Sequence, residues 1–117
     1  MTGNRPWRNN NPGSSLLNYK NNVGDTTKVG KYSPLGDSPY GALDMAGNTW
    51  EWVTDWYAAD YYSKSPLNNP SGPVMGEYRV LRGGCWFDDS GWRTAERVNW
   101  RPHFADDGMG FRCAFSP

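Results

Sequence analysis

The sequence has little that would suit it to nucleic acid or to a membrane. Its 117 residues include 12 basic and 12 acidic side chains, and neither sign forms a run of five or more. The concentrated basic surface that phosphate binding needs is therefore missing. The longest apolar stretches are only a few residues, whereas a membrane-spanning helix needs about 20. We expect no nucleic-acid partner and no membrane span.

Cysteine and histidine are also scarce. Cys85 and Cys113 are the only cysteines, and they allow at most one internal disulfide. Two buried thiols that act as small hydrophobic groups are an equally good interpretation. His103 is the only histidine, so no cluster is available for a non-haem iron or catalytic zinc site. No nucleophile-elbow motif supports a Ser-His-Asp site around it.

Aromatic residues, glycine and proline are abundant instead, with 7 Trp, 7 Tyr, 14 Gly and 9 Pro. A chain rich in glycine and proline alone would tend to be disordered. Because each Trp or Tyr can bury a large area, we expect a compact, loop-rich fold. The length allows one domain, residues 1–117, near the lower end of sizes that bury an adequate core.

Turn signals dominate residues 1–40, which are predicted to be coil. Residues 49–53 alternate as a strand does, with Trp50 and Trp52 on one face. Helix should be scarce in the second half of the chain. The further strands expected there are residues 79–86, 93–97 and 110–115.

Three motifs occur in a specific order: LDMAGNTWEW at residues 43–52, RVLRGGCW at 79–86 and GFRCA at 110–114. With these motifs the chain resembles the formylglycine-generating-enzyme, or sulfatase-modifying-factor, family. The resemblance implies an α+β, loop-rich, degenerate C-type-lectin fold with short antiparallel strands and little helix. That family's domain is usually about twice this length, and its N-terminal half has no counterpart here. We expect the edge left exposed to favour self-association or a partner chain.

A calcium site is predicted between Asp44 and Glu51, where Gly47 and Asn48 bend the chain. Calcium prefers six to eight oxygens from carboxylates, amides and main-chain carbonyls. The resemblance assigns the side chains of Asp44 and Glu51 as ligands, together with the carbonyls of Gly47 and Thr49. The alternative is that Glu51 forms a salt bridge and Asp44 caps a turn.

A second loop, residues 18–23, resembles the family's other calcium site. There the side chains of Asn18 and Asn21 and the carbonyls of Tyr19 and Val23 would be ligands. Asn21 contributes no charge, and calcium affinity follows the charge of the ligands. Ordinary turn formation by these asparagines is the alternative. Both sites would be structural, because each would tie a coil to the core.

The catalytic cysteines of the family are missing. The enzymes that the chain resembles oxidise a substrate cysteine to formylglycine with two cysteines that bind copper. Asp88 occupies the first of these positions, and no cysteine lies around residues 91–93, where the second would fall. Since Cu(I) needs thiolates, we do not expect formylglycine generation. Cys85 should pack beside the last strand as a buried thiol.

Residues 87–107 form the predicted ligand-binding face. Aromatic side chains beside short polar ones supply rigid contact area and adaptable hydrogen bonds. The pattern also resembles variable proteins of diversity-generating retroelements, many of which use this fold. The predicted contact residues for a protein or small-molecule ligand are Phe87, Asp88, Asp89, Trp92, Asn99, Trp100, His103, Phe104, Asp106 and Asp107.

Two alternatives remain open for this face and for its function. Trp86, Trp92 and Trp100 can instead belong to the core, which is where large aromatics are usually most buried. The chain can also be an oxidoreductase or accessory domain whose chemistry comes from the missing half or from a partner subunit.

Overall fold

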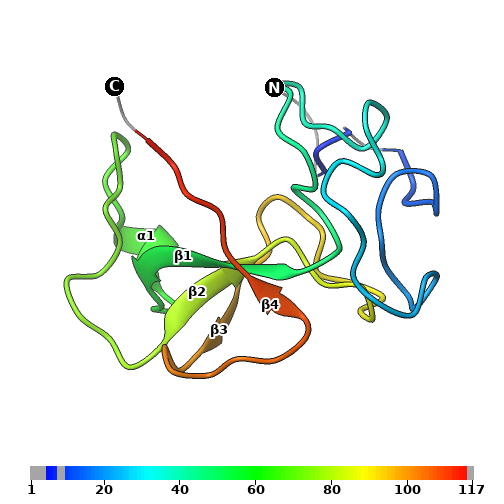
Figure 1. The fold of residues 1–117 in the computed structure, drawn as a ribbon. Coiled ribbons are helices and arrows are strands. Elements are labelled where there is room, and N and C mark those ends of the chain that lie inside the picture. Colours follow the sequence, from blue (N-terminus) through cyan, green and yellow to red (C-terminus); the bar gives the residue numbers. More distant parts are fainter. Residues whose placement is uncertain (1–4, 8–9, 116–117) are drawn as a thin grey trace.

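The computed structural model describes residues 5–7 and 10–115, in which one four-stranded sheet is flanked by long coils (Figure 1). The strand order is β3-β2-β1-β4. Among the described residues, no helical segment could serve as a membrane span. The elements are β1 (Trp50–Trp56), α1 (Tyr61–Lys64), β2 (Arg79–Arg82), β3 (Val98–Trp100) and β4 (Met109–Gly110).

The centre of the sheet is the antiparallel pair of β1 and β2. Trp52 lies opposite Leu81, and the register shifts between Trp52 and Trp56. Leu81 is completely buried. Gly83 and Gly84 follow β2 with φ angles of 99° and 77°. Because side chains other than glycine are strained in this left-handed region, the two glycines turn the chain out of the sheet at that point.

The coil that precedes β1 lies beside the sheet (Figure 1), and main-chain hydrogen bonds join it to the turn after β2 and hold its own segments together. Gly47 N donates to the Gly83 carbonyl at 2.8 Å, and Asn48 N donates to the Asn18 carbonyl at 2.9 Å. Gly47 has a φ of 75°. A Cβ at this position would lie 2.4 Å from the Asn18 carbonyl oxygen. The close approach of the two segments therefore requires glycine here.

The Asn48 side chain strengthens the same junction. Its Oδ1 accepts from Thr27 N at 2.8 Å, and its Nδ2 donates to the Thr27 carbonyl at 3.2 Å. The side-chain amide thus satisfies both main-chain groups of Thr27, as a neighbouring strand would. Asn18 Nδ2 donates to the same Oδ1 at 3.2 Å. One asparagine therefore joins three parts of the coil.

A small hydrophobic core connects the coil with the loop after β2. Its buried members are Trp7, Leu17, Ala46 and Trp92. Tyr19 packs edge-on against Trp92, with ring centroids 5.1 Å apart and planes at 79°. The core interpretation of Trp92 is therefore confirmed. That of Trp100 is wrong, because its side chain is 46% exposed.

The strands predicted at residues 49–53 and 79–86 are found as β1 and β2, although β2 ends at Arg82. The prediction of a strand at 93–97 is wrong. The carbonyls of Thr94 and Glu96 face the Arg82 guanidinium instead of a strand, at 2.8 and 3.3 Å. The third strand is β3, immediately after this segment.

The last strand was expected at residues 110–115, but β4 contains only Met109 and Gly110. It pairs in parallel with β1, so two of the three strand pairs are antiparallel and the third is not. Residues 111–115 leave the sheet because Arg112 bonds to the loop before β1. β3 and β4 are the outer strands, and self-association through such an edge stays a prediction.

Candidate functional site

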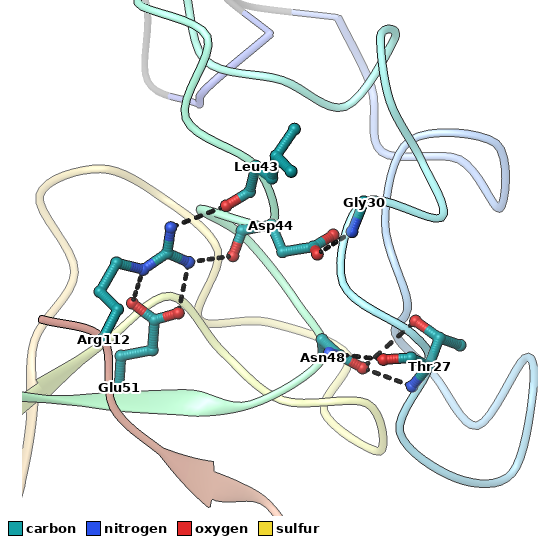
Figure 2. A network of polar contacts seen from close by, with 7 residues as sticks. All are labelled: Thr27, Gly30, Leu43, Asp44, Asn48, Glu51 and Arg112. Carbon is teal, nitrogen blue, oxygen red and sulfur yellow. Dashed lines mark hydrogen bonds and ion pairs between the residues drawn. The ribbon is translucent and has the colours of Figure 1, made fainter.

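The loop from Asp44 to Glu51, the first predicted calcium site, is closed by Arg112 from the segment after β4 (Figure 2). Arg112 Nε donates to Glu51 Oε2 at 2.7 Å, and Nη2 contacts Glu51 Oε1 as well. Nη1 donates to the Leu43 carbonyl at 2.8 Å, and Nη2 donates to the Asp44 carbonyl at 3.0 Å. The salt bridge weighed as the alternative role of Glu51 is thus present.

The Asp44 carboxylate points away from Arg112, toward the coil. Its Oδ2 accepts from Gly30 N at 2.7 Å, and the Gly47 carbonyl accepts from Thr49 N at 2.9 Å. These oxygens are of the type that calcium prefers. The carboxylate of Glu51, however, already balances a cation, and the hydrogen bond between the two raises the pKa of Arg112. Calcium at Glu51 would have to compete with this guanidinium.

In the second predicted calcium loop, residues 18–23, one buried oxygen is suited to bind a cation. Asn18 is completely buried, and its Nδ2 donates to the Asp25 carbonyl at 2.8 Å. Its Oδ1 is buried and has no hydrogen-bond partner in the described part of the chain. A buried acceptor without a partner is costly, so a bound cation there would be favourable.

The remaining predicted ligands of this loop are less enclosed. Asn21 is exposed, with a φ of 55°, and Val23 is 46% exposed. Tyr19 N donates to Asn22 Oδ1 at 3.1 Å, which is the turn role considered as the alternative. Asp25 was missed, although it is the only carboxylate between Asn18 and Thr27. Since no three His, Cys, Asp or Glu side chains gather in the described residues, calcium would depend on amide and carbonyl oxygens together with the single carboxylate of Asp25.

The Asp88 side chain is turned inward, beneath the loop that follows β2. Its Oδ2 accepts from Trp50 Nε1 at 2.6 Å, from Cys85 N at 3.3 Å and from Cys85 Sγ at 3.0 Å. Three donors on one carboxylate oxygen connect β1 to this loop. Asp88 therefore acts as an internal acceptor, and this oxygen is not available at the predicted ligand face.

Neither cysteine forms a disulfide in this structure. Cys85 is buried and Cys113 is exposed, and both are free thiols. Burial and the hydrogen bond to Asp88 raise the pKa of Cys85 to about 12. Because the thiolate is the reactive form, Cys85 is an inert thiol at neutral pH.

Main-chain bonds from the second predicted calcium loop hold the beginning of the predicted face. Lys20 N donates to the Asp88 carbonyl and Asn21 N to the Trp86 carbonyl, both at 2.9 Å. Trp86 N donates in turn to the Asn48 carbonyl at 3.0 Å. The position of this segment is therefore set by main-chain atoms.

The side chains of the predicted face fall into different environments. Trp92 is buried, Asp88 points inward, and Asn99 lies half-buried opposite Val80 in the sheet. The others are exposed: Phe87, Asp89, Trp100, His103, Phe104, Asp106 and Asp107.

Two aromatic groups stand out among the exposed residues. Phe87 packs edge-on against Trp86 at 5.0 Å, and Trp86 Nε1 donates to the Asp107 carbonyl at 3.2 Å. Trp100 and Phe104 form a stacked pair, with centroids 4.6 Å apart and planes at 16°. Exposed, pre-ordered aromatic rings lose little conformational freedom when they bind a ligand.

A cleft of about 310 Å³, here called the Trp92 cleft, was not predicted from the sequence. Residues far apart in the sequence form it, so no local pattern signals it. Tyr40 and Met45, which contribute to its walls, are 85% and 42% exposed. Its lining includes Pro6, Pro39, Tyr40, Met45, Trp92 and Arg93.

Comparisons with known proteins agree with this architecture. The family model of the sulfatase-modifying factor enzyme 1-like domain matches residues 2–117. The chain is 48% identical, over 95 residues, to serine/threonine-protein kinase pkn1 of Chlamydia pneumoniae, covering 77% of this chain and 14% of that protein. It is 40% identical, over 93 residues, to the formylglycine-generating enzyme of Streptomyces coelicolor, covering 76% of this chain and 29% of the enzyme.

Among solved structures, Treponema denticola variable protein 1 has the same fold, with a TM-score of 0.72 and 33% sequence identity. The match covers 92% of this chain and 39% of that one. The C-type-lectin-like, loop-rich fold predicted from the three motifs is therefore confirmed. The chain spans less than a third of the length of the curated relatives named above.

Proposed function

Because the chain belongs to the family of sulfatase-modifying factor enzyme 1-like domains, we propose that it is a noncatalytic module that binds a protein or small-molecule ligand. The finer proposal is a variable protein of the diversity-generating-retroelement kind, with residues 87–107 as its binding face. The likeness to Treponema denticola variable protein 1 supports this proposal.

The observation that carries the noncatalytic part is the inward position of Asp88. Its carboxylate accepts from Trp50, from the Cys85 amide and from the Cys85 thiol. The position that carries a copper-binding cysteine in the enzymes thus holds an acceptor that stabilises the loop. The neighbouring thiol has a pKa of about 12, which is far from that of a reactive cysteine.

Exposed aromatic groups support the binding part of the proposal. Phe87 and Phe104 are 40% and 38% exposed, although each packs against another aromatic ring. The Trp92 cleft, whose lining includes Trp92 of the predicted face, offers about 310 Å³ to a ligand. A volume of this size is at the lower end for small-molecule pockets.

Structural calcium is part of the proposal. The buried, unpartnered Oδ1 of Asn18 supports the loop at residues 18–25 as the stronger of the two sites. A site at Asp44 and Glu51 would form only if Glu51 exchanged Arg112 for the metal ion. Calcium would stabilise the fold in either place, because it would tie coil to core.

The second candidate function is an oxidoreductase or accessory domain of a longer protein. Its support is the 40% identity to the formylglycine-generating enzyme of Streptomyces coelicolor, of which the match covers 29%. In this case, residues outside the chain would supply the cysteines.

Peptides selected from a random displayed library against the immobilised chain test the binding face. The affinity for the selected peptides should fall by about tenfold or more when four residues of the face, Phe87, Asp89, His103 and Phe104, are changed to alanine. Aromatic anchors dominate such interfaces. The matched control is Leu67→Ala with Val74→Ala, because these residues are also exposed, at 100% and 97%. Equal affinity for both variants, with circular dichroism unchanged, would remove residues 87–107 from the proposal.

A further inference from the structure

A second cavity, here called the Arg82–Arg97 pocket, lies between the sheet and α1. Its volume is about 130 Å³, well above the ~10–15 Å³ that one water molecule requires. Side chains two residues apart share one face of a strand. The pocket is lined in this way by Val53 and Asp55 from β1 and by Val80 and Arg82 from β2.

Two guanidinium groups line this pocket, and both contact Tyr62. Arg82 Nη2 donates to the Tyr62 hydroxyl at 2.8 Å, and its Nη1 donates to the main-chain carbonyls of residues 94 and 96. The Arg97 guanidinium lies over the Tyr62 ring, 4.0 Å from its centroid, and donates to the Ala58 carbonyl at 3.5 Å. Every one of these partners is neutral.

The positive charge of the pocket is incompletely balanced. The ion pairs of the described chain are formed by Lys64, Arg101 and Arg112. Neither Arg82 nor Arg97 has a carboxylate oxygen within 4.0 Å. Asp55 also lines the cavity, so the lining has two cations and one anion. Like charges that share a half-buried site repel each other more strongly than they would in water.

An oxyanion would relieve this repulsion. The planar guanidinium presents several N–H donors in a fork that matches carboxylate and phosphate oxygens. Tyr61 adds a hydroxyl that accepts from Gly72 N at 3.0 Å and can donate its own proton. The enclosing side chains exclude part of the solvent, so screening by salt is weaker than on an open surface.

We infer that the Arg82–Arg97 pocket binds a small oxyanion, a carboxylate or a phosphate group. The evidence is two guanidinium groups that have no acidic partner within 4.0 Å, both contact Tyr62 and line one cavity of about 130 Å³. Although Arg97 lies within residues 87–107, none of the predicted contact residues of that face lines this pocket. The inference does not depend on the function proposed above.

Inorganic phosphate and acetate, titrated separately at constant ionic strength, test the inference through two-dimensional NMR of the labelled chain. Either anion should produce saturable shifts at Tyr62 and Arg97. Arg97→Gln should weaken binding by about tenfold or more, because charge-assisted hydrogen bonds are lost. Asp55→Asn should tighten it, because it removes a repelling carboxylate.

The matched controls are Arg101→Gln and Asp37→Asn. Arg101 also lies over a tyrosine ring, Tyr78, at 5.8 Å, but it is outside the pocket. Should Arg97→Gln disturb the fold, Arg97→Lys preserves the charge and should bind more weakly than the native chain. Saturation by phosphate alone, or by acetate alone, supports the site and identifies its ligand. Shifts that do not saturate with either anion, or equal losses in Arg97→Gln and Arg101→Gln, overturn it.

Discussion

At the scale of single residues, polar side chains bring distant segments together in place of regular structure. Asn48 matches both main-chain groups of Thr27, and Asp88 accepts from Trp50, which is 38 residues away in the sequence. Each contact satisfies main-chain or indole groups that would otherwise be part-buried without a partner. Single substitutions at these positions should therefore lower the free energy of unfolding more than the surface exposure of the residues suggests.

Asp88→Ala should lower the free energy of unfolding by about 2–4 kcal/mol, because it leaves the Trp50 indole and the Cys85 amide without their acceptor. Urea denaturation monitored by tryptophan fluorescence measures this loss. Asp89→Ala is the control, since Asp89 is exposed and adjacent in the sequence. A loss no larger than that of the control would show that Asp88 is not the internal acceptor described here.

At the scale of elements, Arg112 fastens the segment after β4 to the loop before β1. A guanidinium that pairs with Glu51 and also reaches two carbonyls is better fixed than a single surface ion pair. A double-mutant cycle of Arg112→Gln and Glu51→Gln should therefore give a coupling energy of about 1 kcal/mol or more.

The Lys64–Asp60 pair serves as the comparison for that cycle. It is an i,i+4 pair whose side chains are 64% and 65% exposed, against 39% and 21% for Arg112 and Glu51. Its coupling energy should be clearly smaller, because solvent screens an exposed pair. If the two cycles gave the same value, the contact at Arg112 would be an ordinary surface pair.

The sequence predicts the strands of this fold better than it predicts their partners. Alternation around Trp50 and the glycines after Arg82 are local signals, and β1 and β2 lie where those signals are. The parallel pairing of β4 with β1 depends on contacts about 60 residues apart along the chain, so no local pattern reveals it. The segment at 93–97 is too short and too polar to give a clear local signal, and its carbonyls accept from Arg82.

The candidate site was predictable to a similar degree. The motifs around Asp44 and Glu51 predict a calcium loop that runs into β1, and calcium there stays a prediction. They could not show that Arg112, 61 residues away from Glu51, would face it. The inward turn of Asp88 and the two cavities also depend on long-range packing, which a single sequence does not contain.

At the scale of the whole molecule, coil outside the sheet is held by a small core and by isolated polar contacts. Calcium at the loop of residues 18–25 would add a strong tie. Saturating calcium should raise the melting temperature by several degrees, since a ligand at 100 times its Kd contributes about 2.7 kcal/mol. A chelator should reverse the gain.

Asp25→Asn should abolish this response, and Asp37→Asn in the same coil should retain it. Elemental analysis of the purified chain separates the two candidate functions at the same time. Calcium without copper or iron agrees with the binding module, whereas stoichiometric copper or iron favours the oxidoreductase. A melting temperature indifferent to both calcium and chelator would remove the metal from the proposal.

Main-chain hydrogen bonds hold the loop after β2 in place. The amides of Lys20 and Asn21 donate to the carbonyls of Asp88 and Trp86, and the Trp86 amide donates to the Asn48 carbonyl. Peptide groups are the same whatever side chain a residue carries. Outward positions such as 87 and 89 can therefore be randomised in a combinatorial library while the loop keeps its path. This property of the loop is what the proposed variable-protein function would require.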